Sequence, residues 1–283
     1  MSKSTKIWLV IGALFIFLGT AIFGGVMLYL GGNYNKLSTA KYQTTTFSNL
    51  GEFNSILIDV TTADIEIKQS DTLESKVVVY DQENVGYSAV TIDGVLEIKA
   101  TDNRTWRDYL GISFTTSKVT IYLEKATYYD LLINASTGDV SVMQSFTFNS
   151  INVTLSTGDV NISNATILEE FVVNVTTGDV EIKNCTLKKF TSKGGTGDIE
   201  LDNVIAIEHF TIERSTGDIE FVKCDAYELF IKTSTGNIKG TLLSEKKFNA
   251  KTNTGKKRVP STLNGGDCVL NTSTGDIIIS IVN

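Results

Sequence analysis

Apolar and polar residues alternate on both sides of a glycine that recurs every 19 or 20 residues through the second half of the chain. Around Gly178, for example, the apolar positions are Phe171, Val173, Val180 and Ile182. A period of two is typical of a half-buried strand. Each unit is therefore predicted to contain a strand, a tight turn, a second strand and a shorter return segment. The eight turn glycines are Gly138, Gly158, Gly178, Gly197, Gly217, Gly236, Gly255 and Gly275.

Self-similarity at a fixed period of this size indicates a repeat architecture in which each unit packs on its neighbours. The predicted fold class is all-β, a right-handed parallel β-solenoid (β-helix) of coils about 20 residues long. Glycine suits the turn because it adopts positive φ without a Cβ penalty. Pro260 is the single proline, as expected where nearly every strand is paired on both sides.

An acidic column follows the turn glycines: Asp139, Asp159, Asp179, Asp198, Asp218 and Asp276. Stacked coils would place successive members ~4.8 Å apart, and calcium ligation is one interpretation. Asn237 and Lys256 interrupt the column, and the nine-residue Gly-Gly-x-Gly-x-Asp repeat is absent. We therefore expect solvated carboxylates that accept hydrogen bonds from Thr and backbone N–H groups, with no metal and no cofactor.

The same column bears on catalysis, because glycosidases use paired carboxylates. Any Asp ladder satisfies that spacing, and no large inserted loops wall a cleft. The single histidine, His209, removes most histidine-based schemes. A polysaccharide-acting β-helix enzyme is thus the least favoured interpretation, and no catalytic residue is predicted.

The segment from Ile7 to Leu30 contains no charged residue and is long enough to cross the ~30 Å hydrocarbon core. Lys3 and Lys6 precede it, which predicts a cytoplasmic N-terminus at residues 1–6 and an extracytoplasmic remainder. A cleaved signal peptide is the alternative, although no Ala-x-Ala site follows. We expect a single-pass protein of the cell membrane, held in the lipid bilayer through a transmembrane helix at residues 7–30.

Three further segments are predicted: a polar stalk at 31–46, an irregular β module that starts the solenoid at 47–125, and regular repeats at 126–283. Within the module, Ala63 takes the place of the turn glycine in a degenerate first coil, and Asp93-Gly94 is a hairpin signal. The excursion Thr101–Ser117 is either a lid or a binding loop. The candidate binding residues there are Arg104, Trp106, Arg107 and Tyr109.

A basic run stands out in a chain whose net charge is -7: Lys246, Lys247, Lys251, Lys256, Lys257 and Arg258. It is either a solvated face or a patch that contacts a polyanion such as wall polymer or lipid headgroups. The overall charge argues against nucleic acid as a partner. The three cysteines, Cys185, Cys224 and Cys268, are expected to be buried reduced thiols.

The stretches Ile58–Ile67 and Ser117–Leu123, the Ser-Thr-Gly-Asp ladder and the N-terminal apolar segment resemble one family. It is the bacterial "putative adhesin" family of β-strand repeat proteins, an N-terminally membrane-anchored domain of unknown function. The resemblance covers the chain after the stalk and implies a surface role, without a defined ligand. The anchor is similar to that of relatives linked with cell-envelope stress systems in Gram-positive bacteria.

The expected function is a non-catalytic surface adhesin-like or envelope-associated binding module, whose partner is an envelope polymer or a membrane protein. An accessory of a cell-envelope stress signalling system is the alternative. The C-terminal strand, with Ile277, Ile279 and Ile281, is expected to be the open edge of the final coil, one coil beyond Lys256. Such an edge favours self-association or docking by strand addition.

Overall fold

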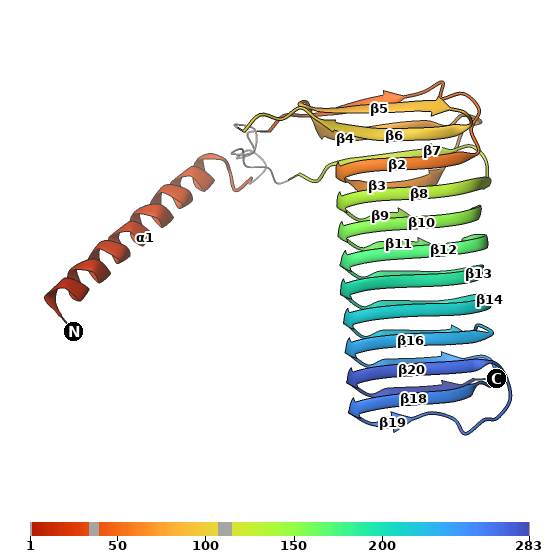
Figure 1. The fold of residues 1–283 in the computed structure, drawn as a ribbon. Coiled ribbons are helices and arrows are strands. Elements are labelled where there is room, and N and C mark those ends of the chain that lie inside the picture. The colour runs from red at the N-terminus through yellow and green to blue at the C-terminus, as the bar shows by residue number, and fades with distance from the viewer. Residues whose placement is uncertain (1, 34–39, 107–114, 283) are drawn as a thin grey trace. The chain divides into compact units, whose positions relative to one another are not determined.

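The computed structural model describes residues 2–33, 40–106 and 115–282 (Figure 1). The chain divides into two compact units. One contains residues 1–42 and 104–116, and the other contains residues 43–103 and 117–283.

The first unit contains one helix, α1 (Lys3–Tyr29). Ser2 caps it, because the Thr5 N–H donates to the Ser2 Oγ at 3.1 Å. None of its side chains is buried, and it is long and apolar enough to cross a membrane. The predicted helix is confirmed, with its start four residues earlier at Lys3.

The second unit is a stack of two-strand coils (Figure 1). Coils pair in parallel in the register set by the repeat, so that Ile151 lies beside Leu131 on one side and Phe171 on the other. The strands after the first module are β8 (Thr127–Thr137), β9 (Val140–Val142), β10 (Thr147–Thr157), β11 (Val160–Ser163), β12 (Thr166–Thr177), β13 (Val180–Thr196), β14 (Ile199–Thr216), β15 (Ile219–Cys224), β16 (Glu228–Thr235), β17 (Ile238–Leu242), β18 (Lys247–Thr254), β19 (Lys257–Arg258), β20 (Asp267–Thr274) and β21 (Ile277–Ile281).

The inward columns predicted from the alternation form the core. Phe171, Phe190 and Phe210 stack along the solenoid axis, with ring centroids 5.2 Å and 6.0 Å apart. Such contacts between aromatic rings add to the stabilisation from burial. The all-β solenoid predicted from the sequence is therefore present, with one continuous core running through the coils.

A second corner of each coil was not predicted. Six residues after the repeat glycine, Asn164, Asn184, Asn203 and Lys223 adopt positive φ of 52–60°. Asparagine tolerates this left-handed conformation better than most residues. The asparagines also form a ladder, since the Asn203 Nδ2 donates to the Asn184 Oδ1 at 2.9 Å. The recurring Asn therefore marks a turn.

The irregular module contains β1 (Tyr42–Phe47), β2 (Ser55–Thr62), β3 (Asp64–Gln69), β4 (Lys76–Gln82), β5 (Val85–Ile92), β6 (Val95–Asp102) and β7 (Lys118–Leu123). On one side β2 and β3 pair in parallel with β8 and β9, and on the other with β6 and β7. Ala63 occupies the glycine place, and its N–H donates to the Thr137 carbonyl at 3.0 Å. Antiparallel pairs, β5 with β6 and β4 with β7, cover this end of the stack. The hairpin at Asp93-Gly94 is confirmed.

The other end of the stack differs from the expected chain order. Strand β20 lies between β16 and β18, and β21 lies between β17 and β19. The prediction that the C-terminal strand is the open edge is therefore wrong, because the chain folds back and inserts its last coil beneath the preceding one. Within the described residues, β18 and β19 are the outermost strands at this end (Figure 1).

Candidate functional site

The outermost coil, made of β18 and β19 and hereafter the basic coil, gathers five exposed cations without an acidic neighbour on its own strands. They are Lys247, Lys251, Lys256, Lys257 and Arg258. None of the five has an ion pair within the part of the chain that the structure describes. Five positive charges without an ion pair form a local positive field on one outer coil of an acidic protein, although Asp267 on the neighbouring coil is the register partner of Lys247.

One of these residues, Lys257, fits only an outermost coil. Lys257 stands in an inward column, where its register partner Ile277 is fully buried. Burial of an unpaired ammonium would cost several kcal/mol, and Lys257 is exposed because no described coil covers it. An inward-pointing charge is also a known means of protecting a sheet edge.

Lys246 does not belong to this surface, although the sequence places it in the same run. Its side chain is 3% exposed, and its Nζ lies 2.7 Å from the Asp225 Oδ1. The ammonium also donates to Ser244. Lys246 therefore forms an internal ion pair that links two coils. The surface patch contains the other five of the six predicted residues.

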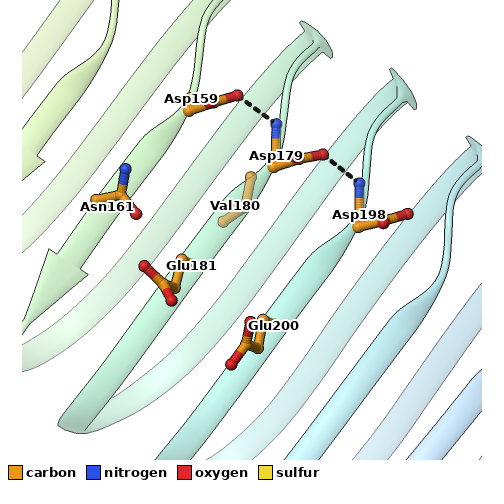
Figure 2. Close-up of a pocket in the computed structure, with 7 residues that line it drawn as sticks. All are labelled: Asp159, Asn161, Asp179, Val180, Glu181, Asp198 and Glu200. Atoms are coloured by element: carbon orange, nitrogen blue, oxygen red, sulfur yellow. Dashed lines mark hydrogen bonds between the residues drawn. The ribbon is translucent and has the colours of Figure 1, made fainter.

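The acidic column forms a hydrogen-bonded ladder along one corner of the solenoid. Figure 2 shows the Asp179 N–H donating to the Asp159 Oδ1 at 2.8 Å and the Asp198 N–H donating to the Asp179 Oδ1 at 2.7 Å. The predicted acceptance of backbone N–H groups is confirmed. A concavity of about 300 Å³ beside it is lined by carboxylates that include Glu181 and Glu200. Among the described residues, no three or more His, Cys, Asp or Glu side chains are grouped so that they could hold a metal ion.

The eight turn glycines share one strained backbone conformation, with φ between 134° and 149°. A Cβ on Gly178 would lie 2.0 Å from the Gly158 carbonyl oxygen of the neighbouring coil. Glycine is therefore required twice, once by the backbone angle and once by the close approach of stacked turns.

The candidate binding residues of the segment Thr101–Ser117 are not part of the basic coil. Trp106 is 69% exposed and Arg104 is half-buried, and both belong to the unit that contains α1. Arg107 and Tyr109 lie outside the described residues. The assignment of this segment as a binding loop stays a prediction.

The three cysteines are buried and form no disulfide. Burial raises the pKa of Cys185 and Cys224 to about 11 and that of Cys268 to about 12. The thiols are therefore protonated at neutral pH and act as small core residues.

The sequence profile of the Toastrack DUF4097 family matches residues 53–260. The chain belongs to this family. The matched residues run from the irregular module to the basic coil, so the Toastrack domain accounts for most of the solenoid. None of the curated proteins matches the chain.

The chain is also similar to several solved structures. A putative adhesin from Bacteroides fragilis NCTC 9343 is 19% identical with a TM-score of 0.55, and the match covers 85% of this chain and 97% of that one. A putative adhesin from Parabacteroides distasonis ATCC 8503 is 14% identical with a TM-score of 0.44, over 87% and 98%. A protein from the same strain, titled a putative lipid binding protein, is 16% identical with a TM-score of 0.42, over 87% and 98%. At 19% identity the likeness to the Bacteroides fragilis protein concerns the fold alone.

Proposed function

We propose that this Toastrack protein is a non-catalytic, adhesin-like binding module of the cell envelope, and that the basic coil is its contact surface for an anionic envelope polymer. In this proposal α1 anchors the chain in the membrane and the right-handed solenoid projects on the extracytoplasmic side. The fold likeness to a Bacteroides protein titled a putative adhesin agrees with a binding role.

The observation that carries the proposal is the separation of charge. The basic coil contributes +5, and the whole chain carries -7, so the remainder carries -12 (-7 minus +5). An anionic polymer is therefore repelled by most of the protein and attracted by one outer coil. Such a charge distribution orients the polymer toward the basic coil and also increases the rate at which the two associate.

The test is binding of the full chain, held in nanodiscs of neutral lipid, to an immobilised anionic polymer. One variant replaces the five cations of the basic coil with Gln. A matched control replaces five lysines that have ion pairs elsewhere and changes the net charge equally: Lys68, Lys99, Lys118, Lys188 and Lys193.

We expect the basic-coil variant to lose most of its binding and the control to keep it, because only the first removes uncompensated charge. Equal binding by all three proteins contradicts the proposal. Binding of wild type to vesicles of anionic lipid, with none to the polymer, replaces the polymer with the membrane surface as the partner.

The extracytoplasmic side is tested separately by cysteine labelling on intact cells. A membrane-impermeant maleimide should label Ser273→Cys, which is exposed in the solenoid, and should leave Ser2→Cys unlabelled. The buried native thiols provide a low background. The opposite labelling pattern would reverse the topology.

A further inference from the structure

A polar concavity of about 410 Å³ lies over three neighbouring strands, β16, β20 and β18. Figure 1 shows these strands side by side at the end of the stack that carries the basic coil. Outward-facing polar side chains line the concavity, among them Lys232, Lys251, Asn271, Ser234, Ser273 and Asn253. No acidic side chain lines it.

The inserted last coil creates this arrangement. Asn271 is the register partner of both Lys232 and Lys251. The two lysines are therefore two coils apart, about 9.6 Å between their backbones at ~4.8 Å per strand. If the coils had stacked in chain order, the lysines would be direct neighbours and would repel each other. With Asn271 between them, two ammonium groups flank an amide that can also donate hydrogen bonds.

The acidic residue beside Lys232 on β14 already forms an ion pair. Glu213 is the register partner of Lys232 on the side away from Asn271. Its carboxylate lies 3.7 Å from the Nζ of Lys193, which is on the next coil along. Within the described residues Lys232 has no ion pair of its own.

The hydroxyl groups divide into two sets. Those of Thr233 and Thr272 donate to the turn carbonyls of Gly217 and Gly236, at 3.2 Å and 2.9 Å, and so stabilise the corner. Ser234 and Ser273 are exposed on the outer face. The donors that line the concavity are thus two ammonium groups, two amides and two hydroxyls, which come from three neighbouring strands.

We infer that this concavity binds a tetrahedral oxyanion, namely the phosphate group of a phosphodiester-linked polymer. A phosphodiester presents two non-bridging oxygens that share one negative charge and accept hydrogen bonds from donors spread around the tetrahedral phosphorus, whereas the preferred acceptor directions of a carboxylate lie near one plane. Lysine supplies point charge without requiring a planar ligand. The inference rests on the proposed function, because it names the anionic group that the basic coil and its neighbour Lys232 would recognise.

The experiment compares Lys232→Gln with Lys188→Gln in the full chain in nanodiscs of neutral lipid. Lys188 lies outside the concavity and pairs with Glu169, so its replacement leaves the ion pair between Lys193 and Glu213 beside Lys232 intact. Three probes are used: a poly(glycerol phosphate), a polyglutamate of similar length, and vesicles containing phosphatidylglycerol. Lys232→Gln should weaken binding to the poly(glycerol phosphate) about fivefold, equivalent to ~1 kcal/mol. It should leave polyglutamate binding nearly unchanged, and Lys188→Gln should leave binding to both polymers unchanged.

If Lys232→Gln behaves like Lys188→Gln toward every probe, or weakens binding to both polymers equally, the phosphate site is overturned. The proposed function still stands in that case, provided that the five-charge variant of the basic coil loses polymer binding. If Lys232→Gln weakens binding to the vesicles and not to the polymer, the phosphate belongs to a lipid headgroup and the polymer is excluded as its source.

Discussion

The backbone N–H of Lys256 donates a hydrogen bond to the Asp276 Oδ1 at 2.7 Å, although Asp276 comes 20 residues later in the chain. In the other rungs of the ladder the donor comes later in the chain than the acceptor, as with Asp179 and Asp159. The reversal follows from the insertion of the last coil. It leaves Lys256 at the end of the ladder, where an ammonium cannot accept a hydrogen bond from a further coil.

The first prediction concerns this end of the solenoid. Replacing Lys256 with Asp and Lys257 with Ile restores the interior pattern of acceptor and inward apolar residue on the outermost coil. We expect the double variant to self-associate through its sheet edge, because the charges that oppose strand addition are gone. Analytical ultracentrifugation of the full chain in detergent measures it. Lys251→Asp, on the outer face of the same coil, is the control and should stay monomeric. A monomeric double variant would refute the protective role of these charges.

The second prediction concerns the carboxylate ladder. Asp179→Ala removes the acceptor of the Asp198 N–H and should lower the free energy of unfolding by ~1–2 kcal/mol. Asp179→Asn should cost much less, because an amide oxygen can replace the carboxylate. Asn237 already does so, since its Oδ1 accepts the Asp276 N–H at 2.9 Å. Denaturant unfolding of the two variants decides between them.

The same ladder predicts insensitivity to chelation. If backbone N–H groups satisfy the carboxylates, EDTA should leave the melting temperature of wild type unchanged. A drop of many degrees on chelation, or an equal loss in the Asn and Ala variants, would point to a bound cation instead.

The third prediction concerns the turn. Gly178→Ala places a Cβ 2.0 Å from the Gly158 carbonyl oxygen at a φ of 146°. Both the clash and the backbone strain oppose the folded state, and we expect a loss of more than ~3 kcal/mol. Thr177→Ala, at the exposed preceding residue, is the control. A small effect of Gly178→Ala on the melting temperature would show that the stacked turns can separate.

The fourth prediction concerns Arg214, which is 4% exposed inside the solenoid. Its Nη2 donates to the Ser192 Oγ at 3.3 Å, whereas its Nε and Nη1 have no partner among the described residues. Because Gly194 has no side chain, the guanidinium of Arg214 can occupy the space beside it. Because an unpaired buried charge is costly, Arg214→Met should stabilise the protein by ~1–3 kcal/mol at neutral pH.

The pH dependence of this effect has a defined sign. Burial lowers the pKa of Arg214 to about 10, and the charge of Asp179 partly opposes that shift. Below this pKa both folded and unfolded chains hold the proton, so the advantage of Met is complete. Above it the folded wild type releases its proton first, so the advantage shrinks. Urea unfolding of wild type and Arg214→Met at pH 7 and above pH 10 measures the stability difference in the two pH ranges. Destabilisation by Met at pH 7 would mean that the guanidinium has found other partners.

Much of the fold could be predicted because the inward columns repeat so strictly. The alternation around Gly178 and the substitution of Ala63 for glycine both correspond to the observed coils. The corner at Asn164, Asn184 and Asn203 was missed, although the recurring Asn six residues after the glycine is a signal for a left-handed residue.

The order of the last two coils was not predicted, since every inward position except Lys257 fits either order. Lys257 carried the decisive information, because a lysine in an inward column belongs at an open end. The burial of Lys246 could not be predicted either, because its partner Asp225 lies on a different coil and 21 residues away. Contacts between coils, rather than the pattern within one, decided both.

The most direct test of the basic coil as the binding surface is the salt dependence of polymer binding. Each ionic contact releases counterions, so the affinity of wild type should fall steeply as salt increases. The variant with five Gln replacements should bind weakly, with a much flatter dependence, while the matched control keeps the slope of wild type. The same slope in wild type and in the basic-coil variant would contradict the account, because it would place the contacts elsewhere on the molecule.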